Sequence, residues 1–193
     1  MTSRTSRPAG SGGTRQVLFV QGAGEGAHRE DAKLAQDLRE KLGPGYLVRY
    51  PQMPGEDDPD DAAWEEVIVA ELADMGDKPI LIGHSAGAAA LCHFLATNGH
   101  DLRVAGLLLL AAPFFGQGGW EVEGFALPAD LGRGLPNGPV FLYHGDADEV
   151  APPAHLDLYA RAIPQAVVRR LKGRDHQLNQ DMTEVARDIL GLG

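Results

Sequence analysis

Short apolar runs alternate with longer segments of helical periodicity along almost the whole chain. The runs have the apolar character of buried strands, and they cover residues 16–20, 47–50, 80–82, 104–112, 140–143 and 167–171. Apolar residues three or four positions apart predict helices over 30–42, 61–75, 88–95 and 179–190, with another that begins at the pair of prolines 152–153. This alternation predicts an α/β fold in which a mainly parallel, six-stranded sheet carries helices on both faces.

The sequence Gly83-His84-Ser85-Ala86-Gly87 lies between the third strand and the helix that follows it. A serine is a poor nucleophile unless geometry and a base activate it. A sharp strand-to-helix turn supplies the geometry, because it holds the hydroxyl out at the carboxyl edge of the sheet. Glycine two positions away on either side relieves crowding in such a turn. We therefore interpret Ser85 as a nucleophile rather than as part of a purely structural glycine-rich turn.

A nucleophilic serine needs a histidine as its base and a carboxylate that orients the histidine. Both residue types follow Ser85 in the chain order that is usual for this motif. The fifth strand opens into a turn that contains Asp146 and Asp148, and the sixth strand is followed by His176. Ser85, one of the two aspartates and His176 thus each stand just past the carboxyl end of a strand. In parallel α/β sheets this edge is where ligands bind.

In these features the chain from Gln16 onward resembles the α/β-hydrolase superfamily, and most of all its small single-domain serine hydrolases of the carboxylesterase and retinoblastoma-binding serine hydrolase type. The resemblance rests on Gly-His-Ser-Ala-Gly around Ser85, on His-Gly-x-x-Asp ending at Asp148, and on Asp-His ending at His176. It implies that Ser85, Asp148 and His176 form a catalytic triad and that the strands lie in the order 2-1-3-4-5-6. Asp146 is the rival for the acid, and we expect it instead to cap the turn by accepting backbone hydrogen bonds.

An acyl-transfer site also needs two backbone donors for the developing oxyanion. The motif itself assigns one of them to the N–H of Ala86, and the resemblance assigns the other to Ala23 in the loop after the first strand. Relatives often have His-Gly where this chain has Gln21-Gly22, which leaves a backbone donor unaffected. The alternative is a dinucleotide-binding turn, because a Gly-x-Gly follows a strand here, but the acidic residue expected after the second strand is missing.

Composition fits one ordinary enzyme domain. The chain has 193 residues, of which 44% are hydrophobic, so we expect one domain over 15–193 behind a flexible tail over 1–14. A formal net charge of -10 argues against nucleic-acid binding. Cys92 is the lone cysteine, and Cys and His do not cluster as metal ligands, so neither a metal nor an organic cofactor is expected. Apolar stretches are too short to span a membrane, and the first 14 residues lack a signal-peptide centre, which makes the cytoplasm the expected location.

Two segments depart from the alternation. Residues 113–138 are too long for a plain connection and carry Phe114, Phe115, Trp120 and Phe125, which we expect to wall the substrate pocket as a short lid. The plainer alternative is that these aromatic side chains only anchor a surface loop. The acidic run 56–61 lacks the spaced ligands of a calcium loop, so it is expected to be solvated, with its end starting the helix over 61–75.

Together these patterns predict a hydrolase that cleaves a small ester-type substrate, either a carboxylic ester or a thioester, through an acyl-enzyme on Ser85. The expected partner is therefore a small acyl substrate. The alternative from another class is a binding protein that keeps the fold without turnover, since fold does not dictate function. Among the other histidines, His84 is expected to point away from the acyl site and His144 to make a structural hydrogen bond.

Overall fold

The computed structural model describes residues 13–99, 101–122 and 126–192 of the chain. Six strands form one parallel sheet in the order β2-β1-β3-β4-β5-β6, which confirms the fold class and the strand order expected from the sequence. The strands are β1 (Arg15–Val20), β2 (Tyr46–Arg49), β3 (Ile80–His84), β4 (Gly106–Leu110), β5 (Val140–Gly145) and β6 (Val167–Leu171).

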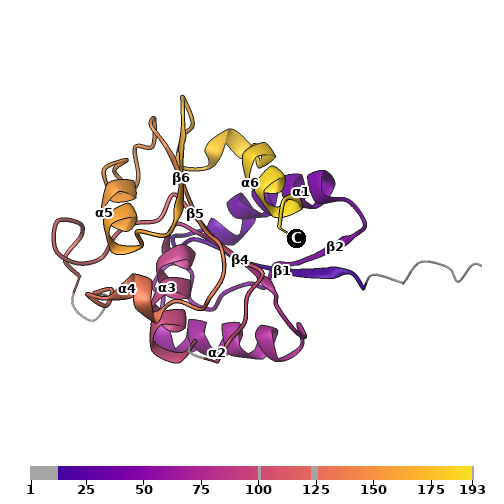
Figure 1. Ribbon diagram of the computed structural model, residues 1–193. Coiled ribbons are helices and arrows are strands. Elements are labelled where there is room, and N and C mark those ends of the chain that lie inside the picture. The colour runs from indigo at the N-terminus through magenta and orange to yellow at the C-terminus, as the bar shows by residue number, and fades with distance from the viewer. Residues whose placement is uncertain (1–12, 100, 123–125, 193) are drawn as a thin grey trace, which may run out of the picture.

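Helices cover both faces of this sheet (Figure 1). One face packs against α1 (Ala27–Leu42) and α6 (Thr183–Leu190), and the other against α2 (Asp61–Ala73), α3 (Ala86–Asn98), α4 (Leu131–Gly134) and α5 (His155–Ala162). Side chains alternate between the two resulting cores: on β1, Phe19 joins the α1 side and Leu18 joins the α3 side. Because both faces are buried, the central strands are continuous apolar runs rather than alternating ones.

The first helix begins earlier than its apolar pattern predicts. It starts at Ala27, three residues before the expected position. N–H groups at its start donate hydrogen bonds to an acceptor that lies outside the helix. The side chain of Glu56 accepts hydrogen bonds from the N–H groups of Gly26 (2.9 Å) and His28 (2.8 Å). The prediction that the acidic run is solvated is therefore only partly correct, because Glu56 accepts these hydrogen bonds. Its other expectation is confirmed, because Asp60 caps α2 by accepting from the N–H of Ala63 at 2.8 Å.

The C-terminal helix is shorter than predicted. A single 3-10 turn, η1 (Leu178–Gln180), precedes α6, and the prediction of one helix from residue 179 was wrong. Leu178, Asn179 and Gln180 all have left-handed backbones, with φ of 49°, 53° and 57°. The side chain of Asn179 accepts from the N–H of Asp175 (2.9 Å), whose own carboxylate accepts from the N–H of Asn179 (2.7 Å). These local side-chain bonds compete with helix formation.

The segment 113–138 divides into two parts among its described residues. Its end forms α4, whose Leu131 is fully buried and joins the core beside α3. Its beginning folds back on itself through a bridge between Phe115 and Trp120. Among its described residues, the end of the segment therefore belongs to the core.

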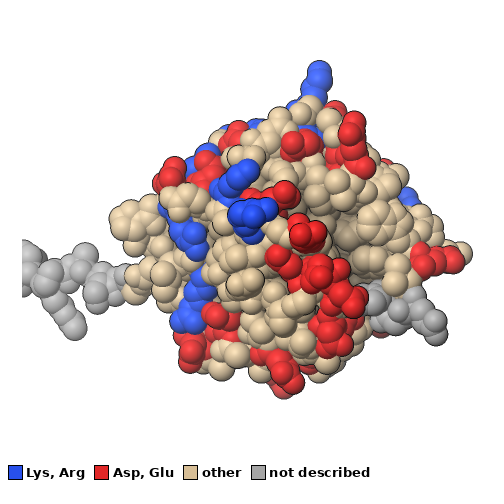
Figure 2. Space-filling model, turned by 180° about the vertical axis from the view of Figure 1, so that it is seen from behind, with Lys and Arg blue, Asp and Glu red and all other residues tan. Residues whose placement is uncertain are grey.

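Among the described residues, no helix is both long and apolar enough to cross a membrane. The charge of the chain is distributed unevenly over its surface. Figure 2 shows the largest gathering of acidic side chains to the right of the centre of the back face, whereas most basic side chains in that view lie toward its left.

Candidate active site

Ser85 occupies the sharp turn between β3 and α3. Its backbone has φ 51° and ψ -124°, a conformation that a residue with a side chain rarely adopts. The flanking glycines are needed because the turn is so tight. A methyl group on Gly83 would lie 2.6 Å from the backbone nitrogen of Ala88, and one on Gly87 would lie 2.6 Å from the carbonyl oxygen of Val20. The sequence therefore builds the tight strand-to-helix turn that was predicted from it, with Ser85 at its apex.

Asp148 and His176 are in direct contact across two neighbouring loops. The Nδ1 of His176 lies 2.9 Å from one carboxylate oxygen of Asp148, whose side chain is fully buried. The other oxygen accepts from the N–H groups of Val150 (2.9 Å) and Ala151 (3.0 Å). With its Nδ1 donating to the carboxylate, the neutral ring of His176 leaves Nε2 free to accept a proton.

The surroundings of Asp148 keep it ionised. Burial by itself raises the pKa of this carboxyl, but hydrogen bonds from His144 and His176, with those from the backbone, bring it well below its ordinary value. His144 makes the structural contact that was expected, because its Nε2 lies 2.9 Å from the carbonyl oxygen of Ala151 and 3.1 Å from the carboxylate of Asp148. Asp146 instead accepts from the N–H of Gly173 and touches neither histidine among the described contacts.

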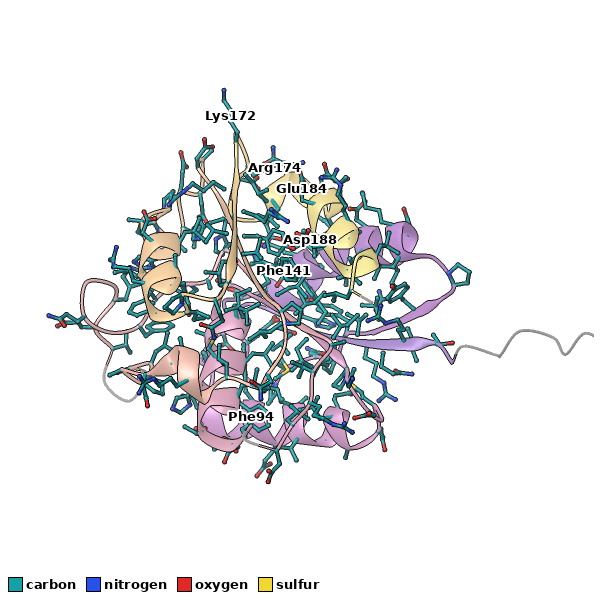
Figure 3. The ribbon with its side chains drawn as sticks, in the orientation of Figure 1. Phe94, Phe141, Lys172, Arg174, Glu184 and Asp188 are labelled. Atoms are coloured by element: carbon teal, nitrogen blue, oxygen red, sulfur yellow. The ribbon has the colours of Figure 1, made fainter. Side chains whose placement is uncertain are left out.

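The loop that carries His176, residues 172–177, is fastened by Arg174. Its guanidinium donates to Asp181 (2.6 Å) and to the carbonyl oxygen of Leu178 (2.9 Å), and Figure 3 shows it close to Glu184 of α6. Its own carbonyl oxygen accepts from the N–H of Ala147 at 3.0 Å. The loop that carries the histidine is thereby tied to the turn that carries the aspartate.

A cavity of about 300 Å³ opens beside Ser85. Its walls come from α2, α3, the loop after β1, the turn after β5 and the segment that begins at residue 113. They are mostly apolar and consist of Ala23, Pro59, Asp61, Trp64, Ser85, Ala86, Ala89, Ala90, His93, Pro113, Phe115, Trp120, Val122 and Val150. Among the described residues, the hydroxyl of Ser85 makes no hydrogen bond of its own.

The aromatic wall of the cavity is held in place by α5. Trp120 packs edge-on against both Phe115 (ring centroids 6.0 Å apart) and His155 (5.3 Å). His155 also accepts a hydrogen bond from the N–H of Phe114 at 3.0 Å, so Nδ1 carries no proton. Phe114 does not line the cavity, because its ring packs edge-on against the buried Tyr159. Phe125, the fourth aromatic residue assigned to the wall, lies outside the described residues.

Ala23 and Ala86, the two expected oxyanion donors, both border the cavity next to Ser85. Ala86 is the first residue of α3, and the first N–H groups of a helix have no partner within it. The loop that carries Ala23, residues 21–26, approaches Ser85 closely: a methyl group on Gly22 would lie 3.1 Å from the Cβ of Ser85. Both backbone segments therefore border the cavity that Ser85 also borders.

Sequence reasoning missed the residues that hold this loop. Gln21 donates to the carboxylate of Glu56 (3.1 Å), and its side-chain oxygen accepts from the N–H of Met53 (3.1 Å). Hydrogen bonds from the backbone N–H groups of His28 and, to a smaller extent, Gly26 keep the pKa of Glu56 below its ordinary value. The glutamate belongs to an acidic run that otherwise faces solvent, so no sequence signal distinguished it.

A second set of missed contacts centres on Asp31 of α1. Asp31 and His84 are each only 1% exposed, and the Nδ1 of His84 lies 2.8 Å from the carboxylate. The Nε2 of His84 lies 2.9 Å from the carbonyl oxygen of His176. His84 points away from the cavity, as expected. Here a signal was present, because Asp31 falls on the apolar face that Leu34 and Leu38 define.

Within the described parts of the chain, no group of three or more histidine, cysteine, aspartate or glutamate side chains is placed to hold a metal ion. The cavity is instead a largely apolar space that Ser85 borders, and a hydrogen-bonded histidine and aspartate lie in the loops after β6 and β5. Such an arrangement can activate a hydroxyl for attack on a carbonyl carbon.

The fold is that of an α/β hydrolase. Over residues 17–189 the chain matches the alpha/beta hydrolase family, and it belongs to that family. No curated protein matches it by sequence.

Solved structures agree with this assignment at the level of the fold. An esterase from Rhodococcus sp. aligns with a TM-score of 0.70 and 21% identity, over 95% of this chain and 93% of that one. A monoacylglycerol lipase from Paleococcus ferrophilus aligns with a TM-score of 0.66 and 18% identity, over 93% and 95% of the two chains. Est1E from Butyrivibrio proteoclasticus gives a TM-score of 0.67 and 17% identity, over 92% and 87%.

Proposed function

We propose that this protein is a serine hydrolase that cleaves a small carboxylic ester or thioester through an acyl-enzyme. The observation that carries the proposal is the contact of Asp148 with His176 beside a strained serine turn that opens on a cavity. A buried, ionised carboxylate that orients a histidine has a direct use when that histidine serves as a base. The named relatives of this fold include esterases and a lipase, which agrees with ester-type substrates.

In the proposed reaction, His176 takes the proton of Ser85 while the serine oxygen attacks the carbonyl carbon of the substrate. Asp148 stabilises the charged histidine, and the N–H groups of Ala23 and Ala86 hold the oxyanion. His176 then returns the proton to the leaving alcohol or thiol as its bond to the carbonyl carbon breaks. Water attacks the acyl-enzyme, gives its proton to His176, and releases the acid while Ser85 regains its hydrogen.

The size of the cavity favours small substrates. About 300 Å³ lies at the lower end of the range found for ligand pockets, roughly 300–1,000 Å³. Phe115 and Trp120 line the cavity, whereas Phe114 does not. We therefore include the first two among the proposed substrate contacts and leave Phe114 out. We keep as a proposal that the first part of the segment 113–138 acts as the wall of the pocket.

A fluorophosphonate probe tests the proposal directly, because it labels only an activated serine. The wild-type protein should be labelled, and Ser85→Ala should abolish the labelling and lower turnover of activated esters by about four to six orders of magnitude. A panel of esters, thioesters and amides would then define the substrate class. A folded protein that resists the probe and cleaves no member of the panel would be a binding protein instead.

A further inference from the structure

The carboxylate of Asp31 lies where three segments of the chain meet. One of its oxygens accepts from the N–H of Gly22 (2.7 Å) and from the Nδ1 of His84 (2.8 Å). The other accepts from the side-chain amide of Gln177 at 2.9 Å. The three segments are the loop after β1, the last residue of β3 and the loop after β6. The proposed function assigns an oxyanion donor to the first, the nucleophile to the residue that follows the second, and the base to the third.

His84 extends this contact to the base itself. Its Nε2 lies 2.9 Å from the carbonyl oxygen of His176, and the two imidazole rings are 4.9 Å apart. His176 is therefore held at two points: Asp148 binds its ring, and His84 binds its backbone. If only the Nδ1 of the ring were held, the ring could still move together with its loop. Holding the backbone of His176 as well prevents that movement.

The geometry also sets the charge of His84. Both of its ring nitrogens face oxygen atoms, one of the Asp31 carboxyl group and the other the carbonyl oxygen of His176. Both oxygens of Asp31 also accept from N–H groups, which favours the ionised carboxylate, and neither an ionised carboxylate nor a carbonyl can donate a hydrogen bond. A neutral imidazole has one N–H and satisfies only one of them, so both bonds require the doubly protonated ring. A buried imidazolium needs a counter-ion, which Asp31 supplies.

We propose that Asp31 and His84 form a buried ion pair that positions the oxyanion loop and the base relative to the nucleophile. Asp31 and His84 are positioning residues, since neither borders the cavity in which the substrate would react. Burial alone lowers the pKa of His84, but the charge of Asp31, its hydrogen bonds and the more distant charge of Asp148 together raise it above its ordinary value. Burial raises the pKa of Asp31, and His84 reverses that shift.

The first experiment examines the wild-type protein and does not depend on the proposed function. Nitrogen-15 NMR of histidine-labelled protein at pH 8 should show a bound proton on both ring nitrogens of the assigned His84. An ordinary imidazole, with a pKa of about 6.5, is neutral at that pH. One protonated and one bare nitrogen on His84 at pH 8 would overturn the ion pair.

The second experiment measures positioning, and in this arm the inference rests on the proposed function. Asp31→Asn keeps the shape of the side chain but removes the counter-ion. It should lower kcat for a short activated ester by about 10–100-fold, since displacements near 1 Å cost about that much, and leave KM within about twofold. The final extent of fluorophosphonate labelling should stay complete while its rate falls, which separates a displaced site from unfolded protein.

Asp188→Asn is the matched control. This partly buried carboxylate in α6, labelled in Figure 3, accepts from the hydroxyl of Tyr143 (2.7 Å) and from Arg169 (3.0 Å). Within the described part of the chain it contacts none of the three proposed triad residues. Its loss should reduce stability but leave kcat within about twofold. An unchanged kcat in Asp31→Asn, or an equal loss in Asp188→Asn, would overturn the positioning role. Failure of the wild-type protein to be labelled by the probe would instead refute the proposed function and leave the NMR result standing.

Discussion

Replacing Gly87 by alanine tests whether the packing of α3 against the loop after β1 sets the oxyanion site. A Cβ at this position would lie 2.6 Å from the carbonyl oxygen of Val20, 2.9 Å from its carbonyl carbon, and closer still to the carbonyl oxygen of Gln21. These are backbone atoms, so no side chain can rotate away. A comfortable carbon–oxygen contact is about 3.3 Å or more, so the loop must retreat by roughly 0.7–1 Å.

That retreat carries Ala23 with it. A displacement near 1 Å at a reacting centre costs about 100-fold, and loss of one oxyanion donor costs about 100- to 1,000-fold. We therefore expect kcat/KM for a short nitrophenyl ester to fall at least about 100-fold in Gly87→Ala. Overpacking should also lower the free energy of unfolding by about 1–3 kcal/mol, which urea titration measures.

Gly45→Ala is the control for this substitution. Gly45 is exposed, and a methyl group built on it meets no atom within 4 Å. Its kcat/KM and stability should match those of the wild-type protein. If Gly87→Ala is folded and retains wild-type kcat/KM, the close approach of the two backbones does not set the oxyanion site, and the assignment of Ala23 is refuted.

Three further predictions concern the acid, the pocket charge and the pocket size. Asp148→Asn should lower kcat by about four orders of magnitude while Asp146→Asn has little effect, and a reversed order would move the acid role. Because the folded-state pKa of Asp148 lies below its unfolded value of about 3.9, the stability lost in that variant should be full at pH 7 and shrink below about pH 4. Asp61 borders the cavity, so its negative charge should repel a negatively charged acyl group. Asp61→Asn should therefore raise kcat/KM for a hemisuccinate ester, relative to that for the uncharged butyrate ester, by about tenfold at pH 8. An unchanged ratio would place the acyl group elsewhere. Activity should peak at acyl chains of about two to six carbons, and Trp120→Ala should flatten that peak, whereas a steady rise to long chains would reveal a deeper tunnel.

The fold was predictable because its signals are local. Each central strand is covered on both faces and must therefore be apolar throughout, which separates it from the helices by pattern alone. The turn at Ser85 was equally visible, since only glycine avoids the backbone collisions at positions 83 and 87. The loop around His176 was predictable in position but not in shape, because the left-handed turn over 178–180 depends on bonds with Asp175.

The walls of the cavity were less accessible to sequence reasoning. Aromatic residues after β4 were an evident choice, and Phe115 and Trp120 do line the space. Phe114 has the same chemistry, yet it packs against Tyr159, because successive side chains in an extended segment point to opposite sides. The contributions of Trp64 and His93 arise from the way α2 and α3 pack together, which no local pattern encodes.

Asp31 shows what kind of information a sequence holds about a buried polar site. An acidic residue on the apolar face of a helix must have partners, since an unpaired buried carboxylate is strongly unfavourable. That inference needs only the helical periodicity of α1. The identity of the partners is another matter, because Gly22, His84 and Gln177 lie 9, 53 and 146 residues away along the chain. Periodicity thus indicates where a partner is required. Which residue becomes that partner is determined only by the sheet order, because it places β1, β3 and β6 in one sheet.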